Sequence, residues 1–368
     1  MMHKRWVALV LLTTGLFFAP VFCLAAVTGD CSTCHTMHNS EAGQLVAFTF
    51  DGTTGDQIAD QGHENLLRTD CIGCHSNVGA ETIVNLGTEQ VPIVFNITEP
   101  TYPPDGSPTS TLAGGNFHWM VSNVKTGHNV QGVGGVDGEP LMDAAPGGVP
   151  RTGNCRNCHG GLGNLQSGCE GCHVPEHHRG GSAPNSVSAQ EQGWYRFLGS
   201  VHLKPSPFEP SPEGVVGIEA PDWEQNPSPT QHNVYQGSVG LYSGVLESGT
   251  INQKCVGCHG RFHTETLSMG TWIRHPVDVA IPNSGEFVGL TTYEPMVPVV
   301  RRNISSADAN FSTVVLGSDL VGCVSCHRPH GSPYPSMLRW GYRDWPGTDS
   351  HTSQPAYNGC AVCHTNKS

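Results

Sequence analysis

The sequence is short of the residues that build an ordinary hydrophobic core and a charged surface. Apolar residues make up 37% of the 368 residues and charged residues 13%, against about 45–50% and about 25% in typical globular domains. Glycine and proline are abundant instead, with 46 and 27 residues. Because such a chain cannot bury a conventional core for its length, another source of apolar surface is needed.

Long apolar runs and clusters of basic residues are also missing beyond the first two dozen residues. The formal net charge is −13, and removal of Lys4 and Arg5 with the N-terminal segment takes it to −15. Nucleic-acid binding needs clustered Lys and Arg, so we expect no nucleic-acid partner. No later run reaches the roughly 20 apolar residues of a transmembrane helix, so the mature chain should contain none.

The N-terminus has the pattern of a secretory signal. His3-Lys4-Arg5 form a charged region, 6–18 an apolar region, and Ala25-Ala26 a small-residue cleavage site. The alternatives are an uncleaved membrane anchor and a lipoprotein modified at Cys23, although the residues before Cys23 lack the small residue of a lipobox. We expect residues 1–26 to be removed and residues 27–368 to form a single exported domain.

No cysteine is left over for a disulfide in that domain. Of 15 cysteines, one is Cys23, and the other 14 form seven Cys-x-x-Cys-His motifs. The paired cysteines are Cys31 and Cys34, Cys71 and Cys74, Cys155 and Cys158, Cys169 and Cys172, Cys255 and Cys258, Cys323 and Cys326, and Cys360 and Cys363. This motif attaches c-type haem covalently. A single CxxC can instead be a redox dithiol or half a zinc site, but seven units each followed by His predict seven haems.

The histidine that closes each motif is the expected proximal iron ligand. These residues are His35, His75, His159, His173, His259, His327 and His364. The haems supply the apolar surface that the composition lacks. We therefore predict a multihaem cytochrome c fold, mostly loop and short helical turns with few short strands, folded around a chain of seven closely packed haems. Short strands are expected near 91–97 and 296–300, and a short helical piece near 192–198.

The motifs are unequally spaced, which excludes a solenoid of equal repeats. The units that begin at Cys155 and Cys169 lie only 14 residues apart. That separation is too short for a separate domain around each haem, so these two haems must be neighbours.

Twelve histidines remain for seven distal positions once the proximal ligands and His3 are set aside. Bis-histidine coordination throughout is the simplest interpretation; it implies low potentials and no vacant iron, although eight methionines leave a His/Met haem possible. The stronger candidates are His38, His118, His128, His202, His232, His275 and His330. The weaker ones are His63, His177, His178, His263 and His351. His38 and His330 follow proximal histidines too closely to reach their own haem, and of adjacent His177 and His178 we expect one to ligate.

Several short segments resemble the OmcS-type extracellular multihaem cytochromes, which polymerise into nanowires. They are Cys31-Ser-Thr-Cys-His-Thr-Met-His-Asn-Ser40, Gly127-His-Asn129, Arg274-His-Pro276, Cys323-Val-Ser-Cys-His-Arg-Pro-His330 and Cys360-Ala-Val-Cys-His364. The resemblance implies a largely loop fold, bis-histidine haems in a continuous stack, and a homopolymer in which His38 ligates a haem of the neighbouring subunit. The chain departs from that family in having seven motifs rather than six, and in the close pair at Cys155 and Cys169.

Three functions compete on these observations. The first is a secreted electron conduit, a self-assembling extracellular filament that passes electrons between partner cytochromes and extracellular acceptors. The second is a monomeric periplasmic carrier or a subunit of a porin–cytochrome conduit. The third is a multihaem reductase, which needs a five-coordinate haem; since all seven motifs end in His and spare histidines are plentiful, we expect an electron-transfer protein and no enzyme.

Overall fold

A computed structural model describes residues 27, 29–37, 39–59, 66–103, 107–130, 132–133, 168–179, 186–199, 214–239, 249–264, 275–341 and 358–366. The predicted signal at 1–26, the motif Cys155, Cys158 and His159, and the candidate ligands His38, His63, His202 and His351 lie outside these residues. The side chains of Cys258 and His263 also lie outside them. None of the described helices is long and apolar enough to cross a membrane.

Helices are short, and most of them coincide with the haem-attachment motifs. They are α1 (Cys31–Cys34), α2 (Cys71–His75), α3 (His118–Ser122), α5 (Ile251–Thr264), α6 (Cys323–Cys326) and α7 (Gly359–Cys363). Single 3₁₀ turns are η1 (Val124–Thr126), η2 (Gly168–Gly171), η3 (Gln190–Gln192), η4 (Tyr195–Phe197), η5 (Gly285–Phe287), η6 (Ser306–Asp308) and η7 (Pro335–Met337). The helical piece expected near 192–198 is therefore two 3₁₀ turns.

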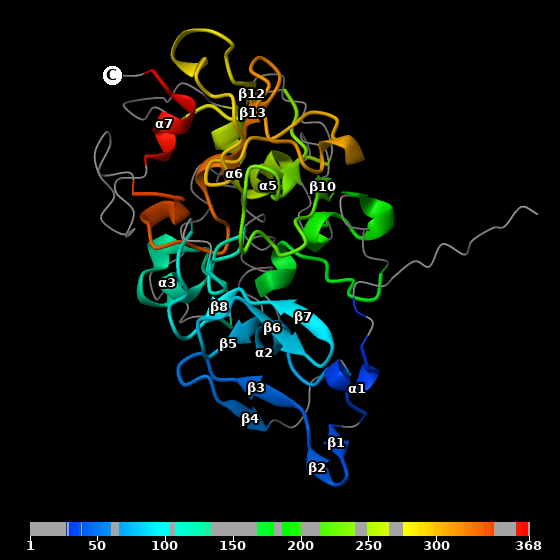
Figure 1. Cartoon of the computed structure of the whole chain (residues 1–368). Helices are drawn as coiled ribbons and strands as arrows, with labels where there is room; N and C mark the ends of the chain where they lie inside the picture. The colour runs from blue at the N-terminus through cyan, green and yellow to red at the C-terminus, as the bar shows by residue number, and fades with distance from the viewer. Residues whose placement is uncertain are drawn as a thin grey trace, which may run out of the picture.

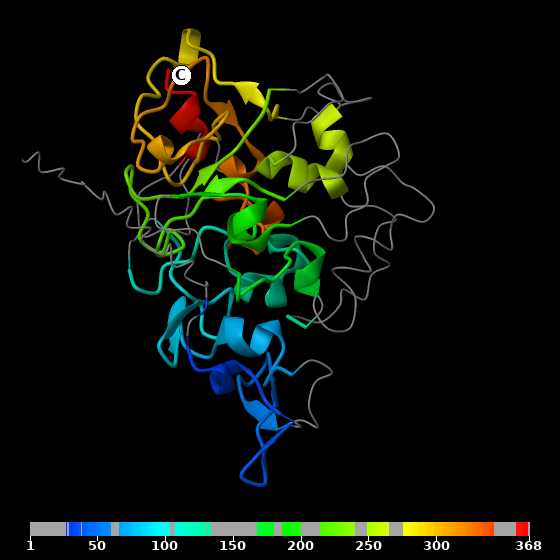
Figure 2. The same ribbon diagram turned by 90° about the vertical axis from the view of Figure 1, so that its right-hand side faces the viewer.

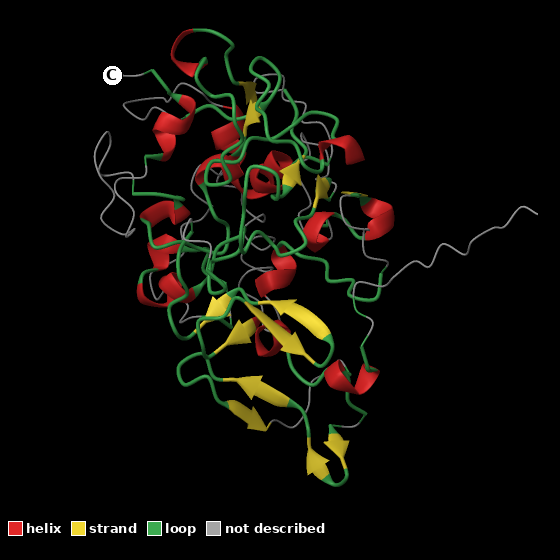
Figure 3. Ribbon diagram, viewed as in Figure 1, coloured by secondary structure: helices red, strands yellow, loops and turns green. Residues whose placement is uncertain are grey.

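Strands pair in small ladders rather than in one sheet. Antiparallel pairs join β1 (Ser40–Glu41) to β2 (Gln44–Leu45), β3 (Phe48–Phe50) to β4 (Gln57–Ala59), β6 (Ile83–Leu86) to β7 (Glu89–Pro92), and β12 (Val279–Ala280) to β13 (Leu320–Val321). The strand β5 (Ser76–Asn77) pairs in parallel with β8 (Phe95–Asn96), and β10 (Gly217–Ile218) lies between β9 (Val187–Ser188) and β11 (Val234–Tyr235). Loops predominate, as predicted, and the longer strands gather in the N-terminal part (Figure 3).

Two local expectations were imprecise. The segment 91–97 holds the end of β7 and all of β8, whereas 296–300 forms no strand and contributes only a bridge between Val300 and Leu320. The motif at Cys255 lies in a 14-residue helix rather than a single turn. Buried Ile251 begins that helix, and its geometry breaks at His259, where φ is −105° and ψ is 40°.

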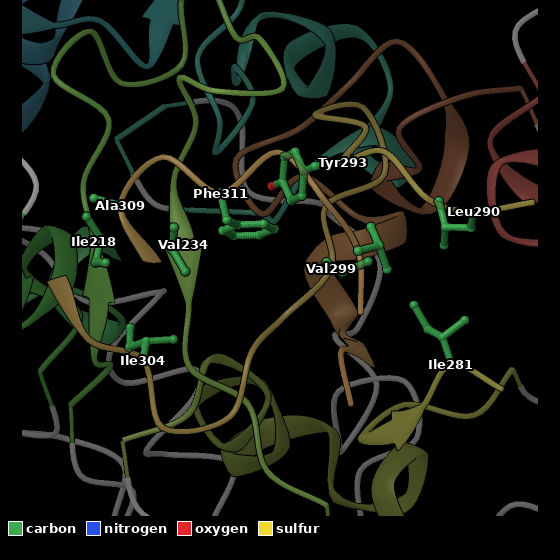
Figure 4. Close-up of a cluster of buried hydrophobic side chains, with 10 residues drawn as sticks. Ile218, Val234, Ile281, Leu290, Tyr293, Val299, Ile304, Ala309 and Phe311 are labelled. Carbon is green, nitrogen blue, oxygen red and sulfur yellow. The ribbon is translucent and has the colours of Figure 1, made fainter. Parts of the chain in front are cut away.

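The apolar interior is divided into three small clusters. One lies in the N-terminal half and contains Ile72, Phe95, Phe117, Met120, Val130 and Val133. A second joins Tyr195, Val215, Tyr235, Ile251, Val300, Leu320 and Val324. The third includes Ile218, Val234, Tyr293, Val299 and Phe311 (Figure 4). The division agrees with a fold in which the cofactors separate the apolar side chains into islands.

The motif helices are distributed along the long axis of the molecule. In Figure 1, α1 and α2 lie toward one end, next to the β1–β2 hairpin, while α5, α6 and α7 lie toward the other. The orthogonal view keeps the same order (Figure 2). The attachment sites therefore extend from one end of the described structure to the other.

Gly115 packs against the segment that follows His327, whereas Gly132 has the same backbone conformation but no close neighbour. Gly115 has φ of 90° and Gly132 has φ of 92°. A Cβ atom on Gly115 would overlap the carbonyl oxygen of Gly331 and come within 2.9 Å of Arg328 Cβ, whereas one on Gly132 meets nothing within 4 Å. Both alanine variants carry the left-handed penalty of about 1–2 kcal/mol, but only one carries the clash.

We therefore expect Gly115→Ala to lower the free energy of unfolding by more than about 3 kcal/mol. Gly132→Ala should lower it by about 1–2 kcal/mol. Urea titration followed by far-ultraviolet circular dichroism measures both. If both variants lost the same free energy of unfolding, the close packing at Gly115 would be contradicted.

Candidate haem-binding site

Apart from the motif at Cys255, which lies within the longer helix α5, each described attachment motif is one helical turn that ends at its histidine. In four motifs the histidine N–H donates to the carbonyl of the first cysteine, with distances of 2.8 Å for His35, 2.9 Å for His173, 3.0 Å for His327 and 2.9 Å for His364. The Asp70 side chain accepts a hydrogen bond from Gly73 N at 3.0 Å and caps α2, and the Asn358 side chain caps α7. The turn thus presents two thiols and one imidazole from five consecutive residues, the donor set that c-type haem requires.

The motif imidazoles are held by hydrogen bonds at Nδ1. The acceptors are Leu66 O for His35 (3.2 Å), Pro92 O for His75 (2.8 Å), Arg196 O for His173 (3.0 Å), Ser336 O for His327 (2.8 Å) and Glu286 Oε1 for His364 (2.7 Å). Since a carbonyl can only accept, Nδ1 carries the proton and Nε2 offers its lone pair. Metal-binding histidines are fixed in this way by an outer hydrogen bond.

Two of these acceptor carbonyls belong to residues with a strained backbone conformation. Arg196 has φ of 47° and Ser336 has φ of 60°, the left-handed region that non-glycine residues avoid. Arg196 is held there by Glu219, which accepts from its backbone N at 2.8 Å and from its guanidinium at 3.3 Å. Strain of this kind persists only where the surrounding structure imposes it, and here it aims two carbonyls at proximal histidines.

Five proximal histidines face a second histidine from a distant part of the chain. The ring centroids are 5.8 Å apart for His35 and His178, 6.1 Å for His75 and His177, 6.0 Å for His173 and His330, 6.2 Å for His259 and His128, and 6.2 Å for His364 and His275. His35 Nε2 and His178 Nε2 are 3.5 Å apart.

These separations fit a metal ion between the rings. A metal–imidazole bond is about 2 Å long, so two trans ligands place their nitrogens about 4 Å apart and their ring centroids about 6 Å apart. Several distal candidates also carry the outer hydrogen bond: His128 Nδ1 lies 2.7 Å from Pro329 O, and His275 Nδ1 lies 2.9 Å from Pro276 O. The residues present therefore fit a haem at each of these five sites.

Burial favours the neutral form of five of the paired imidazoles. Desolvation lowers the pKa of His173 to about 4 and that of His330 to about 3. It also lowers the pKa of His75, His128 and His177. The neutral imidazole is the form that binds a metal.

Among the stronger candidates, His128, His275 and His330 each face a motif histidine. The tandem His177-His178, from which we expected a single ligand, has both rings placed opposite different proximal histidines. The two lie in a turn, where the side chains of neighbouring residues diverge. Their adjacency in the sequence was the available signal, but it gave no indication of which motifs they would face.

His118 and His232 face no motif histidine within the described part of the chain. His118 Nδ1 lies 2.9 Å from Asn96 O. His232 is only 2% exposed and stacks on Tyr293 with a centroid distance of 3.6 Å. Its Nδ1 lies 2.8 Å from Asn233 O and its Nε2 2.9 Å from Phe311 O. This geometry favours a packing role for His232, because both ring nitrogens already have partners.

Neighbouring sites are joined by short connections. His177 and His178 join the sites of α2 and α1, and the side chain of Cys71 lies beside that of Cys169. Pro329, which binds His128, precedes His330, so the sites at Cys255 and Cys169 adjoin.

The row continues toward the C-terminal end. The side chain of Cys255 lies beside that of Cys323, and Cys326 lies close enough to Cys360 and Cys363 to interact electrostatically. The six described motifs therefore form one row.

Comparisons with known proteins agree with this geometry. A family model described as a doubled CXXCH motif matches residues 318–368. The curated C-type cytochrome OmcS of Geobacter sulfurreducens is 24% identical over 366 residues, covering 84% of this chain and 78% of that protein. The solved outer membrane cytochrome S filament from the same organism has a TM-score of 0.52 at 17% identity, with 93% of each chain covered. The cryo-EM structure of OmcS nanowires has a TM-score of 0.54 at 17% identity, covering 93% of this chain and 100% of that one.

The fold and the attachment sites define a multihaem c-type cytochrome. Within that class the chain is similar in sequence and fold to OmcS, which confirms the resemblance seen at its motifs.

A variant of His232 separates packing from ligation. His232→Ala should lower the free energy of unfolding by about 3 kcal/mol, because it leaves a cavity beside Tyr293 and removes the polar contacts of the ring with Asn233 O and Phe311 O. The number of low-spin haems, counted by electron paramagnetic resonance, should not change. His118→Ala, on a half-buried ring, is the matched control for stability. Loss of one low-spin haem in His232→Ala would show that His232 is a ligand after all.

Proposed function

We propose that this protein is an exported heptahaem c-type cytochrome that conducts electrons along a row of bis-histidine haems and assembles into an extracellular filament. Residues 1–26 are the export signal, and residues 27–368 form one haem-bearing domain. Electrons enter from partner cytochromes and leave to extracellular acceptors. The row of six described attachment motifs, five of which place their histidine opposite a second one, carries this proposal, because adjacent redox centres along one axis serve electron transfer from end to end.

The chain's own residues hold, space and insulate the centres. When bound, each haem supplies an iron that cycles between the ferric and ferrous states. The two cysteines fix the ring, and the Nδ1 hydrogen bonds orient both imidazoles and increase their basicity. Two histidine ligands to one iron would give a low potential and would leave no position for a substrate, which favours electron transfer over reductase chemistry.

Assembly into a homopolymer is supported by the N-terminal end of the structure. Around α1 and the first two hairpins, Met37, Leu45, Ile58 and Leu66 are exposed apolar side chains. Exposed apolar surface of this kind marks protein contacts. The structural neighbours are filaments of OmcS. We propose that a second copy covers this surface and that His38, beside it in the sequence, ligates a haem of that copy.

The tandem histidines give a direct test of bis-histidine ligation. His177→Met and His178→Met should each convert one haem to His/Met coordination and raise its potential, and the double variant should convert two. Near-infrared magnetic circular dichroism counts the methionine-ligated haems. His118→Met is the control and should convert none. A double variant that matches either single variant would show that only one of the pair ligates.

Electron microscopy of the extracellular fraction tests assembly. We expect haem-containing filaments from the wild type, whereas His38→Ala should yield folded, haem-loaded subunits that assemble poorly. The His118→Ala variant should form filaments normally. Monomers alone from abundantly expressed wild-type protein would refute the filament and favour a periplasmic carrier or a conduit subunit. Unchanged filaments from His38→Ala would refute His38 as the bridging ligand.

A further inference from the structure

Two of the most deeply buried side chains in the molecule are arginines. Arg328 is 2% exposed and Arg339 is 1% exposed. Arginine is almost never fully buried unless a carboxylate pairs with it. Burying two guanidiniums therefore has a desolvation cost that other interactions in the fold must offset.

The partners of Arg328 are neutral. Its Nε donates to Tyr102 Oη at 3.1 Å, and its Nη1 donates to Leu112 O at 2.8 Å and Ala113 O at 3.1 Å. Arg339 likewise donates from Nε to Val324 O at 2.6 Å and from Nη1 to Pro295 O at 3.5 Å.

No described carboxylate forms an ion pair with either arginine. Buried Glu224 is close enough to Arg328 to interact electrostatically, but its Oε1 accepts from Asn233 N at 2.6 Å. Arg301 shows the contrast, since Asp308 and Asp319 each approach its guanidinium to 3.1 Å. Neither buried positive charge therefore has a directly paired counter-ion within the described residues.

Both arginines are fixed to the attachment turn at Cys323. Arg328 directly follows the proximal histidine His327, and its backbone N donates to Met337 O at 2.9 Å. The backbone N of Arg339 donates to Cys326 O at 2.8 Å, and its Nε reaches Val324 inside the turn. The segment around the turn that would bind this haem is therefore held by the same two residues that bring positive charge to it, Arg328 through its backbone and Arg339 through its backbone and side chain.

Buried positive charge acts on the redox state of a neighbouring iron. A ferric haem carries one more positive charge than a ferrous haem, and Coulomb repulsion in a medium of low dielectric is strong and little screened by salt. Burial and the proximity of Arg339 lower the pKa of Arg328, but an arginine remains charged in proteins. The two charges consequently favour the ferrous form, because reduction removes repulsion.

We propose that Arg328 and Arg339 raise the reduction potential of the haem attached at Cys323 and Cys326, so that it is the highest-potential centre of the row. One electron from a neighbouring ferrous haem reduces this ferric iron, and the donor becomes ferric. An electron on the row then occupies this haem most of the time, at an interior site between the α5 and α7 motifs. The inference rests on haem attachment at Cys323, which is part of the proposed function, but not on filament assembly.

Spectroelectrochemical titration of variants tests the proposal. Arg328→Gln and Arg339→Gln should each shift one of the haem components, the highest, to lower potential. Arg328→Lys and Arg339→Lys, titrated at slightly acidic pH, should keep most of the wild-type value, because charge and not shape is the cause. Arg302→Gln is the matched control: it removes the same charge from an exposed position, where water screens it.

A measurement on the wild type keeps the test independent of variant folding. In protein reduced by a single electron per chain, paramagnetic nuclear magnetic resonance should show the first diamagnetic haem next to Met296 and Tyr102, which contact Arg328. A first-reduced haem elsewhere would overturn the proposal, as would glutamine variants that titrate like the wild type or lysine variants that shift as far as glutamine. A full haem count by pyridine haemochrome distinguishes these outcomes from failure of haem attachment.

Discussion

The pairing of a motif histidine with a histidine from a distant segment is the interaction on which the rest of this structure depends. His35 faces His178 and His259 faces His128, so each pair closes a loop of more than a hundred residues. Closing such loops costs conformational entropy that weak contacts do not recover. Two strong metal bonds per site would supply that free energy, and the histidine pairs would then be the fold's long-range links as well as its haem ligands.

This dependence explains the composition and the modest secondary structure. With 37% apolar residues, the chain forms three separate apolar clusters instead of one core. Its strands are two to four residues long in the described part, which would be marginal in a protein that relied on sheets. The backbone is instead used for precise placement of acceptors, and strain is tolerated at Arg196 and Ser336 because their carbonyls orient proximal histidines.

The local part of the site could be predicted from the sequence, and the distant part could not. A CxxCH motif forms its own turn, because the histidine N–H donates to the carbonyl of the first cysteine four residues earlier. The attachment turns could therefore be predicted, and the composition predicted the loop-rich fold. Distal partners depend on contacts across the whole chain. His128, His275 and His330 were among the stronger candidates, yet so was His232, whose partners Tyr293 and Phe311 lie some 60 to 80 residues away. Nothing near His232 in the sequence distinguishes a packed ring from a ligand.

The unequal spacing of the motifs has a physical explanation in the short connections between sites. The sites of α1 and α2 are linked by the single peptide bond between His177 and His178. The sites at Cys169 and Cys255 are linked through Pro329 and His330, and two further neighbours are joined by thiol contacts. Because these connections and not the inter-motif loops set the distance between centres, the loops are free to differ in length. A row of closely spaced centres can therefore arise from a sequence with no repeat where residues that are adjacent in the chain serve neighbouring sites, as His177 and His178 do, and Pro329 and His330.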